Sequence, residues 1–459
     1  MKKLILIILA CIFSFVVKSQ QADSWRFGVL AGIDFSSGIP IAVSGALNTN
    51  EGCASISDGA GNLLFYTDGV SVWNNQNLVM PNGSGLLGGI SSTQSALIIP
   101  KPGSNTLFYV FTVDEIGTPN GFRYSIVDIS LQGGLGDVTA TKNVLILNNV
   151  TEKLTAFQDG FGNYWIAVHE WGSNAFYVYK LISTGIQAPV ITNVGMVHST
   201  AQIQNTYGQM KFSPCGNRLA LATGYLDTVQ LFEFSNTTGV VHTPITIPFT
   251  DHVYGVEFSG NGQRLYVTTY NPLATLVQFD LSSGKQDTII ASLEILSSTP
   301  DIYGLQLAPD NKIYAARAWS PFLGAINNPL VQGSGCNYVD NGFDLDPNFM
   351  GITSSLGLPG YIQSNFMIEF GCVITGITDI QKSTESVIYP NPFVYRFNLQ
   401  LDKMPAELFI HDVTGKLIDH FISGVGNLEY GELLKPGVYF ITLVNKTGIQ
   451  KYKGVKIRN

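Results

Sequence analysis

A short phrase of polar turn residues followed by an apolar run recurs along most of the chain. It is clearest in SPCGNRLALAT at 213–223 and SGNGQRLYVTT at 259–269. Looser copies are DGAGNLLFYTD at 58–68, PGSNTLFYVFT at 102–112, DGFGNYWIAVH at 159–169 and APDNKIYAARA at 308–318. Pro, Gly and Asn supply tight-turn geometries, whereas β-branched and aromatic runs favour strands. Each copy therefore predicts a hairpin turn that leads into a β-strand.

Corresponding apolar residues of the six copies are regularly spaced. They are Leu64, Leu107, Trp165, Leu219, Leu265 and Ile313, at intervals of 43, 58, 54, 46 and 48 residues. Further short apolar runs flank the phrase, such as GQMKF before 213 and VQLFEF after 223. Repeats of this length that hold several short strands are typical of β-propeller blades with four antiparallel strands. Amphipathic stretches with a helical period are scarce, which excludes a helical solenoid.

The number of blades follows from how the ring closes. Closure removes exposed sheet edges, and the spacing predicts a seventh copy near GLPGYIQSNFMIEF at 357–370. SWRFGVLAGIDFSSG at 24–38 has the composition of one or two further strands. We therefore predict seven blades, with the early strands completing the last blade beside 366–370. Six blades is the alternative.

The pattern changes after residue 372. Residues 373–386 are polar and carry no repeat, which indicates a linker. From 387 to 459 apolar and polar positions alternate between turn signals, which predicts a small antiparallel β-sandwich. Residues 20–385 hold 13 Lys and Arg against 27 Asp and Glu, whereas 386–459 hold 9 against 6. We predict an all-β chain with a propeller at 20–372 and a sandwich at 387–459.

The amino terminus has the layout of a secretory signal peptide. Lys2 and Lys3 precede an apolar run at 4–17 and small residues near 19. The run is short for a membrane span, so we predict removal of 1–19 rather than a retained anchor. A pI near 5.2 and a formal charge of −8 give no reason to expect a nucleic-acid partner.

The predicted mature chain keeps four cysteines, Cys53, Cys215, Cys336 and Cys372. An exported protein meets an oxidising environment, which favours disulfides. Four cysteines allow three full pairings, and the sequence does not choose among them. Cys336 and Cys372 flank one repeat and are the pair that we prefer. Four reduced, buried cysteines are the alternative.

The carboxy-terminal block carries Tyr389, Pro390, Asn391, Pro392 and Phe393 in YPNPF, Gly415 and Lys416 in DVTGK, Pro436, Gly437 and Tyr439 in KPGVYFITL, and Lys456 in KYKGVKI. With these residues in this order it resembles the type A sorting domain of type IX secretion in Bacteroidetes-type bacteria. The resemblance implies an export signal that passes from the periplasm to the type IX machinery and is then removed. It implies a final state that is secreted or linked to a surface glycolipid. An immunoglobulin-like accessory module is the alternative.

The body also resembles secreted propeller-like proteins of those bacteria, at 34–74 and at GLPGYIQSNF, 357–366. That group has no assigned chemistry, so the resemblance implies fold and compartment only. The repeated phrase is similar to the strand-turn phrase of WD-repeat and lactonase-like propellers. The Gly-His and Trp-Asp pairs of the WD repeat are absent.

Motifs for catalysis and metal binding are absent from the sequence. It contains no HExxH, GxSxG or CxxC spacing. Asp344, Asp346 and Asn348 alternate as calcium ligands do, but Phe349 stands where an EF-type loop has Gly, which favours a polar rim loop. We therefore expect no cofactor, with calcium as a weak alternative.

Three further polar residues deserve an interpretation. Arg218 and Arg264 occupy the same place in two repeats, which indicates a structural role. His252 is the histidine that we expect nearest a propeller mouth, and a blade-stabilising hydrogen bond is the stronger interpretation of it.

Two functions remain open. The first is a monomeric binding module, secreted or on the cell surface, for an unknown protein or glycan. The second is an extracellular hydrolase or lyase for glycans or lactones, whose acid and base come from separate blades. We favour the first because no catalytic constellation is present. Trp73, Trp171 and Trp319 are candidates for stacking on sugars, although such residues more often pack in blades.

Overall fold

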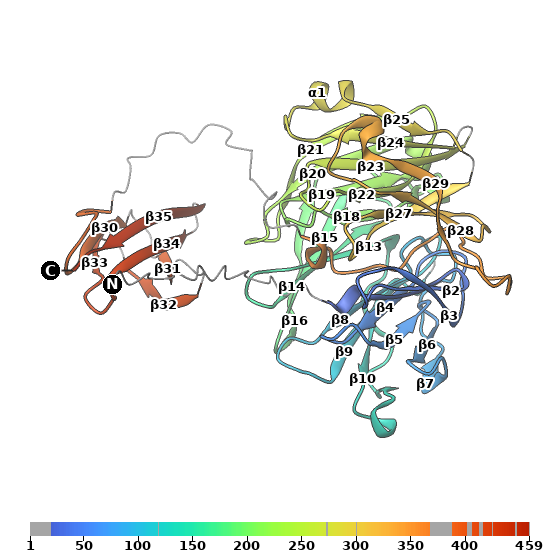
Figure 1. Ribbon diagram of the computed structural model, residues 1–459, viewed down its shortest axis with the longest axis horizontal. Coiled ribbons are helices and arrows are strands. Elements are labelled where there is room, and N and C mark those ends of the chain that lie inside the picture. The colour runs from blue at the N-terminus through green and yellow to red at the C-terminus, as the bar shows by residue number, and fades with distance from the viewer. Residues whose placement is uncertain are drawn as a thin grey trace, which may run out of the picture. The chain divides into compact units, whose positions relative to one another are not determined.

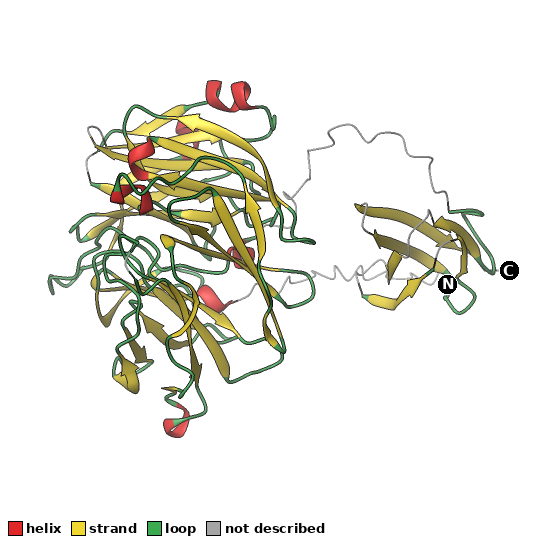
Figure 2. Cartoon of the chain, turned by 180° about the vertical axis from the view of Figure 1, so that it is seen from behind, coloured by secondary structure: helices red, strands yellow, loops and turns green. Residues whose placement is uncertain are grey.

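The computed structural model describes residues 20–458 except 118, 272–273, 300, 368–387, 402–405, 413–415, 425 and 446–447. The chain divides into two compact units, Met1–Gly376 and Ile377–Asn459, and each is considered by itself. Strands dominate both units, with one short α-helix, α1 (Gln286–Ala291), among the described residues (Figure 2). The helices described are all too short or too polar to cross a bilayer. The predicted signal peptide, 1–19, and linker, 373–386, lie outside the described residues.

The first unit is a propeller of seven antiparallel sheets (Figure 1). The amino-terminal sheet holds β1 (Ser24–Phe27), β2 (Val29–Asp34) and β3 (Ile41–Asn48). The other six are β4 (Ala54–Ser57), β5 (Leu63–Thr67), β6 (Ser71–Asn74), β7 (Val79–Ser84); β8 (Ala96–Pro100), β9 (Leu107–Val113), β10 (Phe122–Asp128), β11 (Asp137–Val138), β12 (Val144–Leu147); β13 (Val150–Gln158), β14 (Tyr164–Glu170), β15 (Ala175–Ile182), β16 (Gly185–Ile186), β17 (Val190–Asn193); β18 (Met210–Phe212), β19 (Arg218–Thr223), β20 (Thr228–Phe234), β21 (Val241–Pro248); β22 (His252–Phe258), β23 (Arg264–Asn271), β24 (Ala274–Asp280), β25 (Glu294–Ser297); and β26 (Ile302–Leu307), β27 (Ile313–Arg317), β28 (Phe322–Ile326), β29 (Tyr338–Asp344). The predicted all-β propeller is confirmed.

The repeated phrase forms the same part of six sheets. Its turn joins the first strand to the second, and its apolar run is the second strand, from β5 to β27. In the copy at 213–223, the Ser213 hydroxyl accepts hydrogen bonds from the amides of Asn217 and Arg218. Gly216 has a φ of 64°, and a Cβ there would lie 2.2 Å from the Phe157 ring of the preceding sheet. The turn glycine therefore serves both the hairpin and the packing of neighbouring blades.

The first strands of the sheets pack against one another and line the centre of the ring. Two glutamine side chains connect them across sheets. The Gln94 carbonyl accepts hydrogen bonds from the amides of Leu154 at 3.3 Å and Met210 at 2.7 Å. The Gln209 carbonyl does the same for Val256 and Leu305, at 3.2 and 3.0 Å. Buried backbone amides at the centre thus find partners where no ladder continues.

A buried ion pair joins three of these first strands. The Lys211 amine of β18 donates to the Glu257 carboxylate of β22 at 2.6 Å, and also to Leu305 O and Gln306 Oε1 of β26. Burial lowers the pKa of Lys211, and the charge of Glu257 opposes that shift. The pair is fully hydrogen-bonded, as a buried charge must be.

Residues 352–366 close the ring through the centre rather than as another blade. Isolated bridges pair Thr353 with Val29, Pro359 with Cys53 and Ile362 with Ala156. A Cβ at Gly357 would lie 2.3 Å from a backbone oxygen of Glu51, so glycine permits this close approach.

The predicted seventh copy of the phrase is not found at 357–366, and the predicted pairing beside 366–370 falls mostly outside the described residues. The early strands β1–β3 form their own sheet, and no seventh copy of the phrase occurs at 357–366. Phe366 ends a 3₁₀ turn (Gln363–Phe366), and 368–370 lie outside the described residues. The Pro-Gly and Gly-Leu-Pro sequences of this segment suit a bent path between backbones better than a ladder strand.

The preferred disulfide between Cys336 and Cys372 is also wrong. Cys336 is a free thiol in the core of the first unit, as is Cys53. Burial raises the pKa of the Cys336 thiol, and its backbone lies in a tight turn, Gly333–Cys336, that directs the side chain inward. Cys215 is the cysteine that is disulfide-bonded. The alternative of four reduced cysteines fails for that reason, and Cys372 lies outside the described residues.

The second unit is the predicted antiparallel sandwich. One sheet has the order β32 (Leu417–Ser423), β31 (Ala406–Asp412), β34 (Gly437–Asn445) and β35 (Gly448–Lys456). The other pairs β30 (Phe397–Leu401) with β33 (Gly426–Tyr430). Their facing sides enclose a core of Phe393, Phe397, Leu408, Ile410 and Ile441.

Candidate functional site

The two faces of the ring differ in chemistry. Because the strands of each sheet are antiparallel, the loop before a first strand and the loop between second and third strands lie on one face. We call this the start face. The repeated turns lie on the opposite face, the turn face. The turns of the repeated phrase serve the scaffold in each copy, whereas the loops of the start face differ from blade to blade.

Acidic and tyrosine side chains from several blades gather on the start face. We call them the tyrosine–glutamate cluster: Glu51, Glu115, Glu152, Tyr207, Tyr225, Tyr254, Tyr270 and Tyr303. Most precede or begin a first strand, while Glu115 and Tyr225 follow a second strand and Tyr270 lies near the end of one. The cluster draws on at least five sheets, so it exists only in the closed ring.

Three tyrosine rings of the cluster contact one another, two pairs of them edge to face. Tyr254 lies nearly perpendicular to both Tyr270 and Tyr303, with centroids 6.1 and 5.4 Å apart. Tyr270 and Tyr303 are 6.0 Å apart at 34°. These are favourable aromatic geometries, so the phenol groups are held in fixed positions.

The glutamates beneath the rings are held by hydrogen bonds. Tyr254 donates to Glu51 at 2.9 Å. Glu152 is fully buried, and its carboxylate accepts from the amide and hydroxyl of Thr93 and from the amide of Ile116, at 2.8–2.9 Å. Burial, and then the charge of Glu152, raise the pKa of Glu51 to about 8. Burial also raises the pKa of Glu152. At neutral pH Glu51 therefore holds a proton.

A buried lysine and two histidines lie next to Glu152. The Lys153 amine donates to the carbonyls of Thr206 and Tyr207 at 2.8 and 2.6 Å, and burial lowers its pKa to about 7. His169 and His198 stack with centroids 3.8 Å apart at 21°. A metal bound by two imidazoles must lie in both ring planes, which these nearly parallel rings do not allow. Among the described residues no group of three or more His, Cys, Asp or Glu could hold a metal.

His252 lies at the start face, and its ring is held on two sides. Its Nδ1 is 2.6 Å from the Asp227 carboxylate, and it stacks on Tyr225 at 3.9 Å. Both interpretations from the sequence thus meet in one residue. His252 supports the edge of the tyrosine–glutamate cluster.

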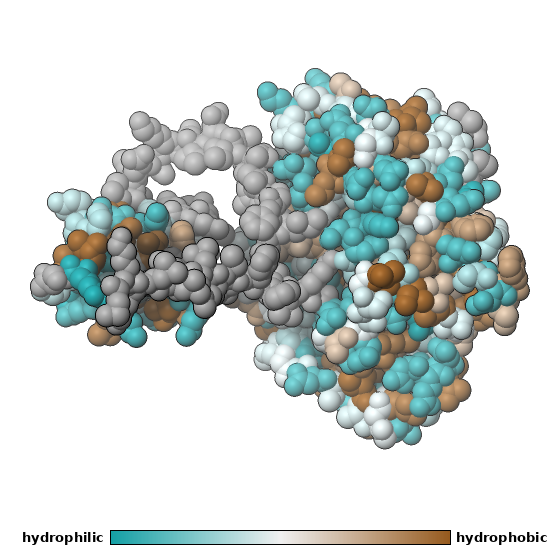
Figure 3. Space-filling model, viewed as in Figure 1, coloured by the Kyte–Doolittle hydropathy of each residue, from teal (hydrophilic) through white to brown (hydrophobic). Residues whose placement is uncertain are grey.

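Exposed apolar side chains lie on connected loops of the start face. Phe349 is 93% exposed and Trp319 56%, and both have φ near +57°, as does Leu30. The loops that carry them are hydrogen-bonded together, through Val29 with Thr353 and through Ser354 with Ser320. Large residues adopt this left-handed backbone only at a cost, so the surrounding loops must impose it. Figure 3 shows other brown apolar side chains at the ring surface.

Asp346 keeps the Phe349 loop in place. Its carboxylate accepts hydrogen bonds from the amides of Met350, Gly351 and Ile352 at 2.6–3.2 Å. This is the carboxylate that the sequence offered as a calcium ligand. In the structure this carboxylate caps the turn. Calcium binding stays an untested prediction.

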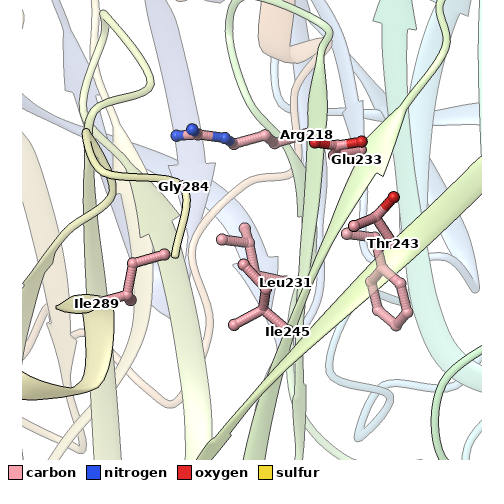
Figure 4. Close-up of a pocket in the computed structure, with 8 residues that line it drawn as sticks. Arg218, Leu231, Glu233, Thr243, Ile245, Gly284 and Ile289 are labelled. Carbon is pink, nitrogen blue, oxygen red and sulfur yellow. The ribbon is translucent and has the colours of Figure 1, made fainter. Parts of the chain in front are cut away.

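A pocket on the side of the ring lies between the sheet of β18–β21 and the segment around α1 (Figure 4). It holds about 320 Å³ of empty space, open solvent included, and Leu231, Ile245 and Ile289 line it. Arg218 extends across it and donates to Gly262 O and Leu281 O of the next sheet, both at 3.1 Å. Arg264 forms an ion pair with Asp280. Both arginines bind the scaffold, and the pocket has no reactive constellation.

The sorting-signal residues of the second unit fall into two groups. Asn391, Phe393, Tyr439 and Lys456 hold the sandwich together. Asn391 bonds both Lys453 O and Val455 N, at 2.6 and 2.9 Å. Phe393 is buried, and the buried Lys456 amine donates to Gly431 O and Glu432 O. YPNPF and the basic end are therefore brought together.

The other sorting-signal residues lie at the surface. Tyr389 is 73% exposed. Pro390, Pro392, Lys416, Pro436 and Gly437 are exposed too. Gly415 lies outside the described residues. The exposed group is the part of the motif that another protein can touch.

Fold and motif together define a propeller followed by a sorting sandwich. Residues 387–457 match the family described as Secretion system C-terminal sorting domain. The chain thus ends in such a domain, which indicates export to the cell surface or the extracellular space.

Solved structures resemble the chain at low identity. A protein from Lactobacillus plantarum is 13% identical with a TM-score of 0.45, covering 72% of this chain and 93% of its own. PorZ, an essential surface component of the type-IX secretion system of Porphyromonas gingivalis, is 14% identical with a TM-score of 0.37, covering 96% and 60%. Hydrazine synthase of Kuenenia stuttgartiensis is 10% identical with a TM-score of 0.40, covering 96% and 98%. No curated protein matches. Likenesses of this size say nothing about activity.

Sequence reasoning missed the tyrosine–glutamate cluster, although a signal was present. Tyr-Gly precedes or begins three successive first strands, at 207–208, 254–255 and 303–304. A Cβ at Gly255 would lie 2.4 Å from Tyr303 O, and one at Gly304 2.9 Å from Leu356 O. The glycines let the strands approach at the centre, and the tyrosines before them point their phenols at the same face.

Proposed function

We propose that the protein is an exported binding module that presents the start face of its ring to a protein or glycan. The sorting domain supports export. The observation that carries the binding proposal is Phe349, an almost fully exposed aromatic ring on a loop that Asp346 fixes. An aromatic side chain that is already ordered loses little entropy on binding, which is how interface anchors gain affinity.

The arrangement around Phe349 fits a binding surface. Trp319, Leu30 and Met350 are exposed on the same connected loops. A large apolar side chain at positive φ has an unfavourable backbone conformation, and its exposure leaves apolar surface in water. Neither effect stabilises the ring. A ligand that covers these side chains removes their apolar surface from water and so gains binding free energy.

Arrays of glycans and of peptides test this proposal. We expect wild-type protein to bind members of one array, and Phe349→Ser or Trp319→Ser to weaken that binding at least about tenfold, the loss of one anchor. Phe161→Ser is the matched control, because Phe161 is 69% exposed on the turn face. Absence of binding on both arrays, or loss with the control alone, would contradict the proposal.

For export, we propose that the exposed residues Tyr389, Pro390, Pro392 and Pro436 contact the type IX machinery. We also propose that the sorting domain is removed after export and that the ring is then attached to a surface glycolipid. Asn391 and Lys456 act indirectly, since they hold the sandwich that presents these residues.

A second candidate is the extracellular hydrolase or lyase. Glu51 favours it, because a carboxyl group that keeps its proton at neutral pH is suited to general acid catalysis. Glu115, from another blade, is the candidate base. Turnover of a glycan or lactone that Glu51→Gln abolishes would establish this candidate. Full activity of that variant, or no turnover by wild type, would exclude it.

A further inference from the structure

The loop between β17 and β18 lies on the start face and is anchored by one buried side chain. We call its residues 195–205 the histidine segment. From 195 to 204, all described in the structure, His198 is the only buried residue. Val197 and Ile203 are 52% and 43% exposed, so these two apolar side chains do not hold the segment on the ring. The anchor of the segment is therefore an imidazole ring.

The anchoring ring makes no hydrogen bond through its side chain. Both nitrogens of His198 and Nδ1 of His169 are shielded from solvent and lack a partner in the described structure. The two rings stack at 3.8 Å, and Phe176 packs edge-on against His169 at 4.7 Å. A neutral imidazole can lie in such surroundings, but an imidazolium would have neither water nor an acceptor for its protons. The stack therefore holds the segment only while both rings are neutral.

Few hydrogen bonds join the segment to the ring. At its beginning the Met196 amide donates to Gln230 Oε1 at 2.9 Å, and the backbone of His198 exchanges two hydrogen bonds with 172–173, at 2.8 and 2.9 Å. From 199 to 205 the described structure has hydrogen bonds only to other residues of the same loop. Local opening therefore breaks few contacts beyond the stack, and it requires less free energy than unfolding of the ring.

A glycine with positive φ stands near each end of the loop. Gly195 has a φ of 84° and Gly208 a φ of 101°. A Cβ at Gly195 would lie 2.8 Å from Gln230 Oε1, and one at Gly208 would lie 2.7 Å from Ala222 O. Glycine fits both places and also allows large changes of φ and ψ. The segment can therefore move about its two ends while β17 and β18 stay in their sheets.

We propose that acid opens the histidine segment, which gives the start face a closed form at neutral pH and an open form in acid. Opening brings water to both rings, so that each can bind a proton without burying its charge. The segment itself contains no titratable residue other than His198. The inference goes beyond the proposed binding function, and its test needs no ligand.

The groups around the two rings oppose protonation in the closed form. Burial, and then the Lys153 charge, lower the pKa of His169 to about 3. Burial, and then the charges of His169 and Lys153, lower the pKa of His198 well below its usual value. Glu170 follows His169, but its carboxylate accepts a hydrogen bond from Tyr177 at 3.4 Å. In the described structure no carboxylate pairs with either ring.

The sign and size of the pH effect follow from the two forms. In the open form both rings have the ordinary pKa of about 6.5, so this form binds up to two more protons than the closed one. The equilibrium constant for opening therefore rises as pH falls below 6.5, by up to about a hundredfold per pH unit. Lys153 has a pKa of about 7, above this range. Glu152 keeps its hydrogen bonds to Thr93 and Ile116, outside the segment, so its titration is the same in both forms.

Hydrogen exchange of the full mature chain tests the inference, with mass spectrometry of peptides that cover 195–205. Labelling times are scaled for the intrinsic pH dependence of amide exchange. Below pH 6.5 we expect protection of these peptides to fall by up to about a hundredfold per pH unit, while peptides of β20 stay protected. His198→Phe keeps an aromatic anchor and leaves one titrating ring, so it should reduce the change to at most about tenfold per pH unit.

His242→Phe is the matched control, because the His242 side chain is 47% exposed on β21, and it should behave as wild type. Tryptophan-fluorescence melting checks that each variant is folded, and His169→Phe is the second ring variant, with the same expected result as His198→Phe. The inference is overturned by protection of 195–205 that does not change with pH, or by equal changes in wild type and the ring variants. Loss of protection in β20 at the same pH also overturns it, because the whole sheet then opens.

Discussion

His169 and His198 show at the residue scale how surroundings decide chemistry. Each carries an ionisable ring, yet burial, together with the nearby Lys153 charge, lowers the pKa of His169 to about 3 and that of His198 well below its usual value. Neither ring nitrogen of His198 has a hydrogen-bond partner in the described structure. Both rings therefore stay neutral, and acid should act against the fold.

This pair predicts a loss of stability toward acid. Below pH 6.5 these two histidines bind protons in the unfolded chain but stay neutral in the folded one. The free energy of unfolding therefore falls as pH falls from 6.5 toward 3. Glu51 acts in the opposite direction between pH 8 and 4.5, because its folded pKa is raised. His198→Phe keeps the stack and should reduce the slope by about 1.4 kcal/mol per pH unit.

Urea unfolding at several pH values measures that slope. Tryptophan fluorescence reports the ring alone, since all five tryptophans, Trp25 to Trp319, lie in the first unit. Equal slopes for wild type and His198→Phe between pH 6.5 and 4.5 would contradict the assignment.

Residue-level prediction from sequence succeeded only where chemistry is local. The turn residue Ser213 and the paired Arg218 could be assigned a scaffold role, because a turn is decided within a few residues. The disulfide could not, since whether Cys336 is buried depends on chain distant in sequence. The pKa of Glu51 could not be predicted either, because burial in the closed ring raises it and the charge of Glu152, on another blade, adds to that shift.

At the scale of elements, the first strands hold the ring together. Second strands share the repeated phrase and were predicted from it, but the first strands differ in sequence because each contacts its neighbours differently. Gln94, Gln209 and the pair of Lys211 with Glu257 connect them across sheets. These residues become neighbours only when the ring closes, so no local sequence pattern predicts the contacts.

The ion pair predicts a large effect from a single change. Lys211→Met leaves the Glu257 charge buried without its partner and should destabilise the ring by about 3–5 kcal/mol. Lys211→Met with Glu257→Gln removes that charge while keeping an acceptor for the Leu307 amide, so most of the stability should return. Chemical unfolding followed by tryptophan fluorescence compares the three proteins. A double variant no more stable than Lys211→Met would show that the pair is not the cause.

At the scale of the whole molecule, the two units divide the work. The ring has a face that carries exposed apolar side chains and the tyrosine–glutamate cluster, and the sandwich carries the sorting signal for export. The sequence identified the address in detail because its motif is contiguous, as in YPNPF and KPGVYF. It identified the ring but not the face, since the cluster is assembled from loops of several blades.

We propose that the sandwich directs export of the ring, so that the start face can act outside the periplasm. Protease accessibility and surface labelling of the ring in intact cells test this most directly, comparing the full chain with a chain that ends before Tyr389. We predict that the full chain is labelled at the surface or found in the medium, and that the shortened chain stays folded in the periplasm. A shortened chain that reaches the surface as efficiently as the full chain would contradict the claim.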